Sequence, residues 1–161
     1  MELEIRAVRS SDIAALVDLA LLAWRPVYAS FRDILGPDIY PAIWPDWKAN
    51  KRRGIARLVA EDSGINAFVA VSDGAVVGFI SYRLDVESRT GTVQYLAVHP
   101  NHQRKGVGTE LNRFALNRMK ESGMRMAVAE TGGDRSHVAA RRSYEKAGYT
   151  GLPLVRYFKM L

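Results

Sequence analysis

The stretch Gln103-Arg104-Lys105-Gly106-Val107-Gly108-Thr109 is a basic loop with two glycines between a predicted strand and a predicted helix. The strand pattern covers residues 92–98 and the helix pattern residues 111–120. Glycine lets a backbone turn tightly and approach an anion without a Cβ in the way. The first N–H groups of a helix lack internal partners and lie at its positive end, so they stabilise an anion. The stretch therefore predicts a phosphate-binding loop.

Hydrophobic periodicity and turn residues predict alternating strands and helices on both sides of this loop. Asp73-Gly74 between two apolar runs is typical of a tight β-hairpin. Pro26 is expected to end or bend the first helix, and residues 28–47, with Gly36 and three prolines, are expected to form short helices and turns. The predicted strands are 2–8, 66–72, 76–84, 92–98, 124–129 and 149–160, and the predicted helices are 12–23, 47–58, 111–120 and 137–147.

Composition indicates one globular domain over residues 1–161. The chain has 48% hydrophobic and 25% charged residues and no cysteine, so disulfides and thiol chemistry are excluded. We see no apolar run near the ~20 residues of a membrane helix and no apolar core of a signal peptide at the N-terminus. These features predict a cytoplasmic protein without a membrane partner.

The formal net charge of +6 is partly concentrated in two places. A basic balance suits nucleic acid, a membrane surface, a small polyanion, or simply a solvated surface. Because no motif interleaves aromatic and basic residues, we expect no nucleic-acid partner. The local clusters suit a small ligand with several phosphates: His102, Arg104, Lys105 and Arg113 surround the loop, and Arg135, Arg141, Arg142 and Lys146 follow later.

Three motifs in order resemble the GCN5-related N-acetyltransferase (GNAT) superfamily. Leu96, Val98 and Pro100 match its strand end, Gln103, Gly106 and Gly108 match its Q/R-x-x-G-x-G/A loop, and residues 144–149 match its Y-E-K-x-G-F/Y helix end. The resemblance implies an α/β (α+β) GNAT fold in one domain. This fold has a mixed central sheet of about 6–7 strands flanked by about four helices, with a splayed, bulged strand at the cofactor site.

The resemblance also implies acetyl-coenzyme A as cosubstrate and no metal. Its pyrophosphate is expected on the backbone N–H groups after Gln103, and its pantetheine arm beside the strand before the loop. His137 stands where many members carry an asparagine that bonds the pantetheine, and this departure leaves that contact open. The implied cofactor-binding residues are Leu96, Ala97, Val98, Gln103, Arg104, Lys105, Gly106, Val107, Gly108, Thr109, His137 and Tyr144.

The implied reaction is transfer of the acetyl group to a primary amine by direct attack in a ternary complex. Tyr144 is expected to be the general acid that serves the leaving thiolate. Glu130 is a candidate general base, because family members place a glutamate at the end of this strand. Asp134, a water chain and His99 remain alternatives. Packing on the helix is the alternative role of Tyr144.

The acceptor is not identified by the sequence. Family resemblance puts its pocket among the aromatic residues of 24–47, with Tyr157 and Phe158 opposite, and small amines, peptides and protein amines all remain open. A catalytically inactive module or sensor that binds coenzyme A or acyl-coenzyme A is the alternative function. The sequence leaves a monomer and a homodimer both open.

Overall fold

The computed structural model describes residues 2–161 and contains one five-stranded sheet with the strand order β1-β2-β3-β4-β5. The strands are β1 (Glu4–Ala7), β2 (Asn66–Ser72), β3 (Ala75–Asp85), β4 (Thr90–Val98) and β5 (Met126–Val128). The helices are α1 (Ile13–Ile43), α2 (Trp47–Ala56), α3 (Val107–Glu121) and α4 (Val138–Lys146), with short 3-10 turns η1 (Ser10–Asp12), η2 (Arg57–Val59), η3 (Pro100–His102) and η4 (Arg135–His137).

The first four strands pair antiparallel, and the predicted hairpin between β2 and β3 is confirmed. Ser72 pairs with Ala75, and the two residues between them have positive φ: 51° at Asp73 and 76° at Gly74. Positive φ at both central positions matches the twist of the flanking strands. This turn fixes the register of the central sheet.

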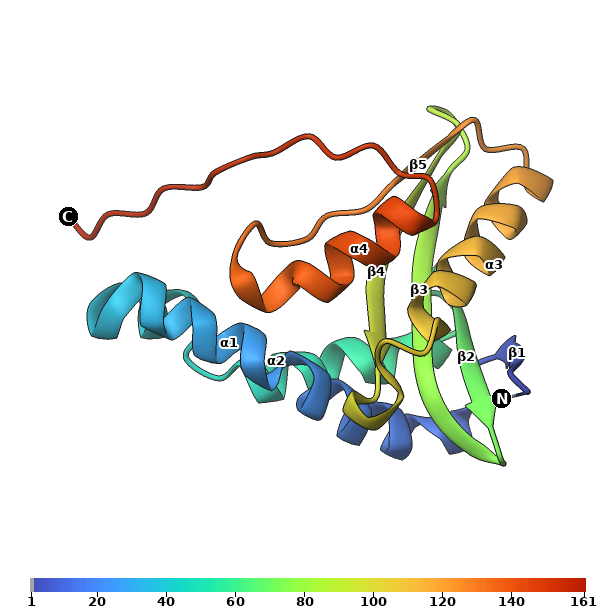
Figure 1. Ribbon diagram of the computed structural model, residues 1–161, viewed down its shortest axis with the longest axis horizontal. Coiled ribbons are helices and arrows are strands. Elements are labelled where there is room, and N and C mark those ends of the chain that lie inside the picture. The colour runs from blue at the N-terminus through green and yellow to red at the C-terminus, as the bar shows by residue number, and fades with distance from the viewer. Residues whose placement is uncertain (1) are drawn as a thin grey trace.

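Strand β4 is bulged and separates from β5, as expected. Its register with β3 shifts between Ser81 paired with Tyr95 and Tyr82 paired with Val93, which leaves Gln94 as an extra residue in β4. β5 pairs parallel with β4 only at residues 90–92. Beyond this point the chain after β5 leaves the sheet, so the end of β4 has an open side (Figure 1).

Helices cover both faces of the sheet. Leu16, Leu19 and Ala20 of α1 pack with Ile55 of α2 on one face, and Leu111, Ala115 and Met119 of α3 pack on the other. α4 lies beside α3 across the open end of β4 (Figure 1). The two layers hold β4 and the start of α3 in a fixed arrangement.

Two predictions about this fold are wrong. Residues 149–160 form no strand, so the sheet has five strands instead of six or seven. Pro153 removes a backbone donor from the segment, and β5 pairs over only three residues, so a further ladder there has little support. The segment after α4 runs extended, and its large apolar side chains are exposed (Figure 1).

The second concerns residues 28–47, predicted as short helices and turns: most of this segment continues α1 to Ile43, and only residues 44–46 lie outside a helix. The helix runs through Pro26, because the carbonyl of Leu22 that loses its partner lies on an exposed side. Only at Gly36 does the backbone leave helical geometry, with φ 76° and ψ −178°. α1 is therefore two helices joined at a kink.

By length and composition, the helical segment 10–43 is apolar enough to cross a membrane. Its sequence contains no long uninterrupted apolar run, because charged residues such as Asp18 interrupt it. Leu16 and Ala20 of this helix are fully buried against the sheet. Of the most apolar 18-residue window of this helix, 28% is buried.

Candidate active site

The phosphate-type loop lies between β4 and α3, where the sequence predicts it. Arg104 and Gly106 both have positive φ, 61° and 87°, and Gly106 caps the start of α3. The Gln103 side chain donates from Nε2 to the carbonyl oxygen of Val98 at 3.0 Å, which ties the loop to the end of β4. The first turn of a 15-residue helix therefore presents its free N–H groups beside a loop held in one conformation.

Gly108 lies where α3, α4 and β4 approach one another. A Cβ at this position would come within 3.0 Å of Ser143 Oγ and 3.6 Å of Val98 Cγ2. Next to it, the fully buried Asn112 donates from Nδ2 to the same Ser143 Oγ at 3.1 Å. The second glycine thus lets α4 approach the first turn of α3, and a larger residue would push the helices apart.

The side of β4 that faces away from β3 is open at Leu96, Ala97 and Val98. All three pair with β3, but none pairs with β5. Ala97 is buried, and Leu96 and Val98 are partly buried. The carbonyl oxygen of Val98 already accepts from the Gln103 side chain. The other backbone groups on this side lie beside a diverging strand and can bind an extended ligand as an additional strand.

Tyr144 lies on α4, with its ring edge-on to Tyr149 at 5.3 Å. Burial raises the pKa of the Tyr144 hydroxyl above its ordinary value, and the nearby Tyr149 adds to this effect. The phenol is therefore protonated at neutral pH and can donate a hydrogen bond. Burial also raises the pKa of Tyr149 to about 12.

Glu130 lies just after β5 on the chain that leaves the sheet, and it is exposed. In the described part of the chain, 2–161, it has no ion pair and no side-chain hydrogen bond. Four residues further on, Asp134 has a very different environment. It is held between α1 and the start of α4.

Asp134 accepts hydrogen bonds from both sides. Ser30 Oγ of α1 donates to Oδ2 at 2.6 Å, and Ser136 donates to Oδ2 from Oγ at 2.5 Å and from its backbone N–H at 3.2 Å. His137 Nδ1 lies 2.5 Å from Oδ1. These donors lower the pKa of the Asp134 carboxyl, although burial alone would raise it.

The loop of residues 131–134 packs tightly around the Asp134 carboxylate. A Cβ at Gly132 would collide with His137 Nδ1 and Asp134 Oδ1, so only glycine allows the approach. Arg141 of α4 donates to the carbonyl oxygens of Gly132 at 2.6 Å and Asp134 at 2.8 Å. Arg141, one member of the second basic cluster in the sequence, therefore holds this loop in place.

Aromatic side chains of α1 and α2 form one connected cluster beside this loop. Trp47 stacks on Tyr28 at 4.3 Å, Phe31 stacks on Trp44 at 4.9 Å, and Phe31 also lies over the His137 ring at 5.7 Å. The cluster therefore reaches from α2 to the turn that begins α4. Tyr157, expected opposite, is 89% exposed on the extended segment.

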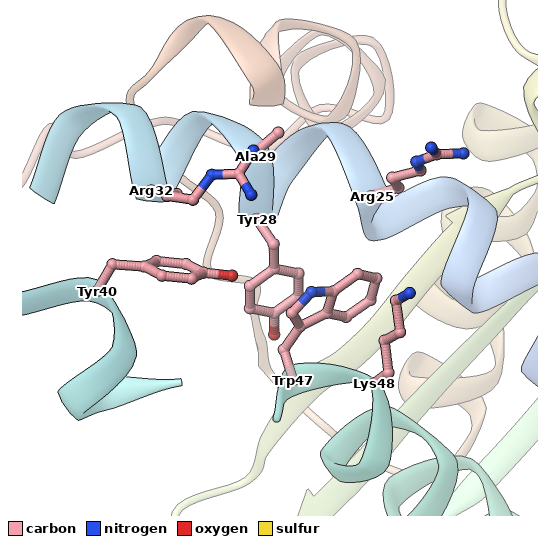
Figure 2. A pocket seen from close by; sticks show the side chains of 7 residues that line it. All are labelled: Arg25, Tyr28, Ala29, Arg32, Tyr40, Trp47 and Lys48. Carbon is pink, nitrogen blue, oxygen red and sulfur yellow. The ribbon is translucent and has the colours of Figure 1, made fainter. Parts of the chain in front are cut away.

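Two adjoining hollows, each of about 280 Å³, lie between α1 and α2. Both include Arg25, Trp47 and Lys48, and Figure 2 shows that Arg32 and the rings of Tyr28 and Tyr40 also line the first one. The second hollow adds Arg52. Among residues 2–161 no acidic side chain lines either hollow, so this face favours anionic over polycationic ligands.

Sequence reasoning missed the contact between Ser30 and Asp134, which joins residues 104 positions apart. The motif Thr131-Gly132-Gly133-Asp134 carried the available signal, because two glycines before an aspartate and a nearby histidine indicate a closely packed turn. The sequence around Ser30 gave no such signal, because the contact with Asp134 is visible only when α1 is placed beside α4.

A model of the acetyltransferase (GNAT) family matches residues 28–149, more than half of the chain. The chain belongs to this family. Like the solved neighbours from this family, it has a mixed α/β fold, with four helices around the sheet in residues 2–161.

Mycothiol acetyltransferase of Sanguibacter keddieii is 33% identical over 104 residues, which are 60% of this chain and 32% of that protein. The chain thus spans about a third of this relative's length. Among solved structures, PaiA N-acetyltransferase from Thermoplasma acidophilum in complex with coenzyme A has a TM-score of 0.72, with 23% identity over 93% of this chain and 91% of that one. An aminoglycoside acetyltransferase from an uncultured soil metagenomic sample has a TM-score of 0.64, with 19% identity over 99% and 96%. At these identities the solved structures establish the fold alone.

Proposed function

We propose that this GNAT acetyltransferase transfers the acetyl group of acetyl-coenzyme A to a primary amine by direct attack in a ternary complex. The observation that carries the proposal is the continuous path from the open side of β4, over the glycine loop, to the first turn of α3. A backbone edge suits an amide-containing arm, and the helix start suits a pyrophosphate.

Donor binding uses mostly backbone groups. The N–H groups of Arg104 to Thr109 hold the pyrophosphate, and Leu96 to Val98 bind the pantetheine arm. The side chains of Arg104 and Lys105 add positive charge at the loop. Charge at this point strengthens phosphate binding but is partly screened by salt.

Tyr144 serves the leaving group. Its raised pKa keeps the hydroxyl protonated, so it presents a donor to the sulfur as the C–S bond breaks. A free thiol has a pKa of about 8.5, so a buried phenol stabilises the thiolate mainly through the hydrogen bond. Protonation of coenzyme A is completed as the product amide loses its extra proton.

The acceptor amine meets a basic surface on the side of α1 and α2. The solved neighbour named as an aminoglycoside acetyltransferase shares the fold, and its acceptor is not inferred for this chain. With Arg25, Arg32, Lys48 and Arg52 lining the hollows, we expect neutral or anionic amines as better acceptors than polycations.

Turnover of acetyl-coenzyme A against an amine panel, followed by thiol release, tests the proposal. Tyr144→Phe keeps the ring and removes the donor, so we expect kcat to fall by about 10-fold to 100-fold with little change in the KM of the donor. Thermal stabilisation by coenzyme A without any turnover would instead support the inactive binding module. Absence of stabilisation would contradict both.

A further inference from the structure

The carboxylate of Asp134 determines the state of the His137 ring. A carboxylate oxygen can only accept, so the 2.5 Å contact requires Nδ1 of His137 to carry the hydrogen. With the hydrogen on Nδ1, the neutral ring has its lone pair on Nε2. In the described residues, 2–161, Nε2 makes no hydrogen bond. Nε2 of His137 is therefore a basic nitrogen with a fixed orientation.

The ring is also held mechanically. Phe31 of α1 stacks on it, the Gly132 backbone lies against Nδ1, and each His137 and Asp134 side chain is only 13% exposed. The cation beside the pair is Arg141 of α4, which binds the loop carbonyls. Arg135, next in sequence to Asp134, is 84% exposed and pairs with Asp33 of α1 at 3.7 Å. Both cations are therefore engaged elsewhere.

We propose that His137, oriented by Asp134, is the general base that deprotonates the acceptor amine, an inference that rests on the proposed acetyl transfer. Nε2 takes a proton from the ammonium, directly or through one water. The neutral amine nitrogen then bonds to the thioester carbon, the C–S bond breaks, and its electron pair leaves on the sulfur of coenzyme A. The amide product forms with release of coenzyme A thiol and one proton.

A base is needed because a lysine-type amine, with a pKa of about 10.4, is neutral in roughly one molecule in 2,500 at pH 7. Asp134 itself is a poor base, because four donors occupy its oxygens and its pKa is lowered. Glu130 is exposed and held by no partner among residues 2–161, so its orientation is not fixed. His137 combines a free lone pair with a fixed position.

The decisive experiment is the pH dependence of kcat for His137→Gln with the best acceptor of the amine panel. We expect kcat to fall by about 100-fold or more and to recover in part when imidazole is added. We also expect the decrease of kcat toward low pH, the acid limb of the pH profile, to disappear. Asp134→Asn should lower kcat by a similar order, since an amide can donate to Nδ1 and reverse the tautomer. Ser30→Ala, which removes one positioning contact, should lower kcat by less than 10-fold.

The position of the His137 ring is tested at the two glycines before Asp134. Gly132→Ala should lower kcat by displacing the ring, while Gly133→Ala, with open space at its Cβ, is the matched control.

The role of His137 can also be tested without an acceptor amine, through the tautomer of its ring. The chain has three histidines, so ¹⁵N-histidine NMR with His137→Gln for assignment should show Nδ1 protonated and Nε2 free in the neutral ring. The opposite tautomer would overturn the proposal. The proposal would also be overturned if His137→Gln left kcat and the acid limb unchanged and only raised the KM for acetyl-coenzyme A. That result would show that His137 contacts the pantetheine and does not act as a base.

Two rival bases are tested in the same assay. His99→Gln and Glu130→Gln are expected to keep the acid limb, and loss of the limb in either one, with His137→Gln unaffected, would overturn the inference. If the wild-type chain acetylates no amine, the proposed function fails and the inference fails with it. If wild type is active and His137→Gln equals it, only the inference fails.

Discussion

Lys51 has an unusual environment for a lysine. Its Nζ lies 4.0 Å from the ring centroid of Trp24 and 4.8 Å from that of Tyr95. Burial lowers its pKa from 10.5 to about 8. The ring faces attract the cation, but burial penalises the charge. A single side chain therefore makes the free energy of unfolding depend on alkaline pH.

The sign follows from proton binding. Between about pH 8 and 10.5 the unfolded chain holds a proton on Lys51 that the folded protein has lost, so this residue makes stability rise with pH. Lys51→Met removes the effect. We expect the stability difference, variant minus wild type, to be more positive at pH 7 than at pH 10, measured by urea unfolding. Lys48→Met on the same helix is the control, and a pH-independent difference at position 51 would contradict the expectation.

Elements in this fold meet through glycines as well as through large side chains. Gly91 of β4 faces α3, and a Cβ there would lie 2.5 Å from Met119 Sδ and 2.8 Å from its Cγ. Met119 itself is 2% exposed. This contact therefore contributes to the distance between β4 and α3, and with it to the position of the loop between them.

Gly91→Ala is expected to overpack this contact and cost about 1–3 kcal/mol of unfolding free energy. The double variant Gly91→Ala/Met119→Ala should show a favourable coupling energy, because the smaller residue 119 makes room for the new methyl group. Chemical denaturation of the four proteins measures the cycle. Additive costs would show that residues 91 and 119 do not compete for space.

Local sequence was sufficient for elements whose signals lie within a few residues. The hairpin at Asp73-Gly74 and the loop before α3 are such cases, since glycine and short polar residues define each turn. α1 could not be predicted from Pro26, because solvent on that side of the helix compensates the missing bond. The Ser30–Asp134 contact could not be predicted either, because it depends on the packing of α1 against the turn before α4.

At the scale of the whole molecule, exposed apolar side chains concentrate in the segment after α4. Seven large ones belong to it: Leu152, Leu154, Val155, Tyr157, Phe158, Met160 and Leu161. Exposed apolar surface of this extent favours association. The sequence predicted a strand here, but a strand needs an edge to pair with, and the sequence could not show that β5 stops at Val128.

Removal of residues 151–161 tests how far this segment contributes to the fold. Because the segment makes no regular pairing, we expect the free energy of unfolding to change by less than about 0.5 kcal/mol and association in light scattering to decrease. Leu152→Ser/Leu154→Ser in the full chain is the matched variant for association. A large loss of stability on truncation would mean that the segment folds against the sheet in solution.

The divergence of β5 from β4 has a consequence for amide hydrogen exchange. In the residues that the structure describes, the backbone N–H groups of β4 that point away from β3 beyond Thr92 have no neighbouring strand. Because no strand pairs with them, their protons can exchange without any unfolding of the sheet. A ligand that takes the place of the missing strand protects them, so the slowing of exchange at the end of β4 records donor occupancy residue by residue.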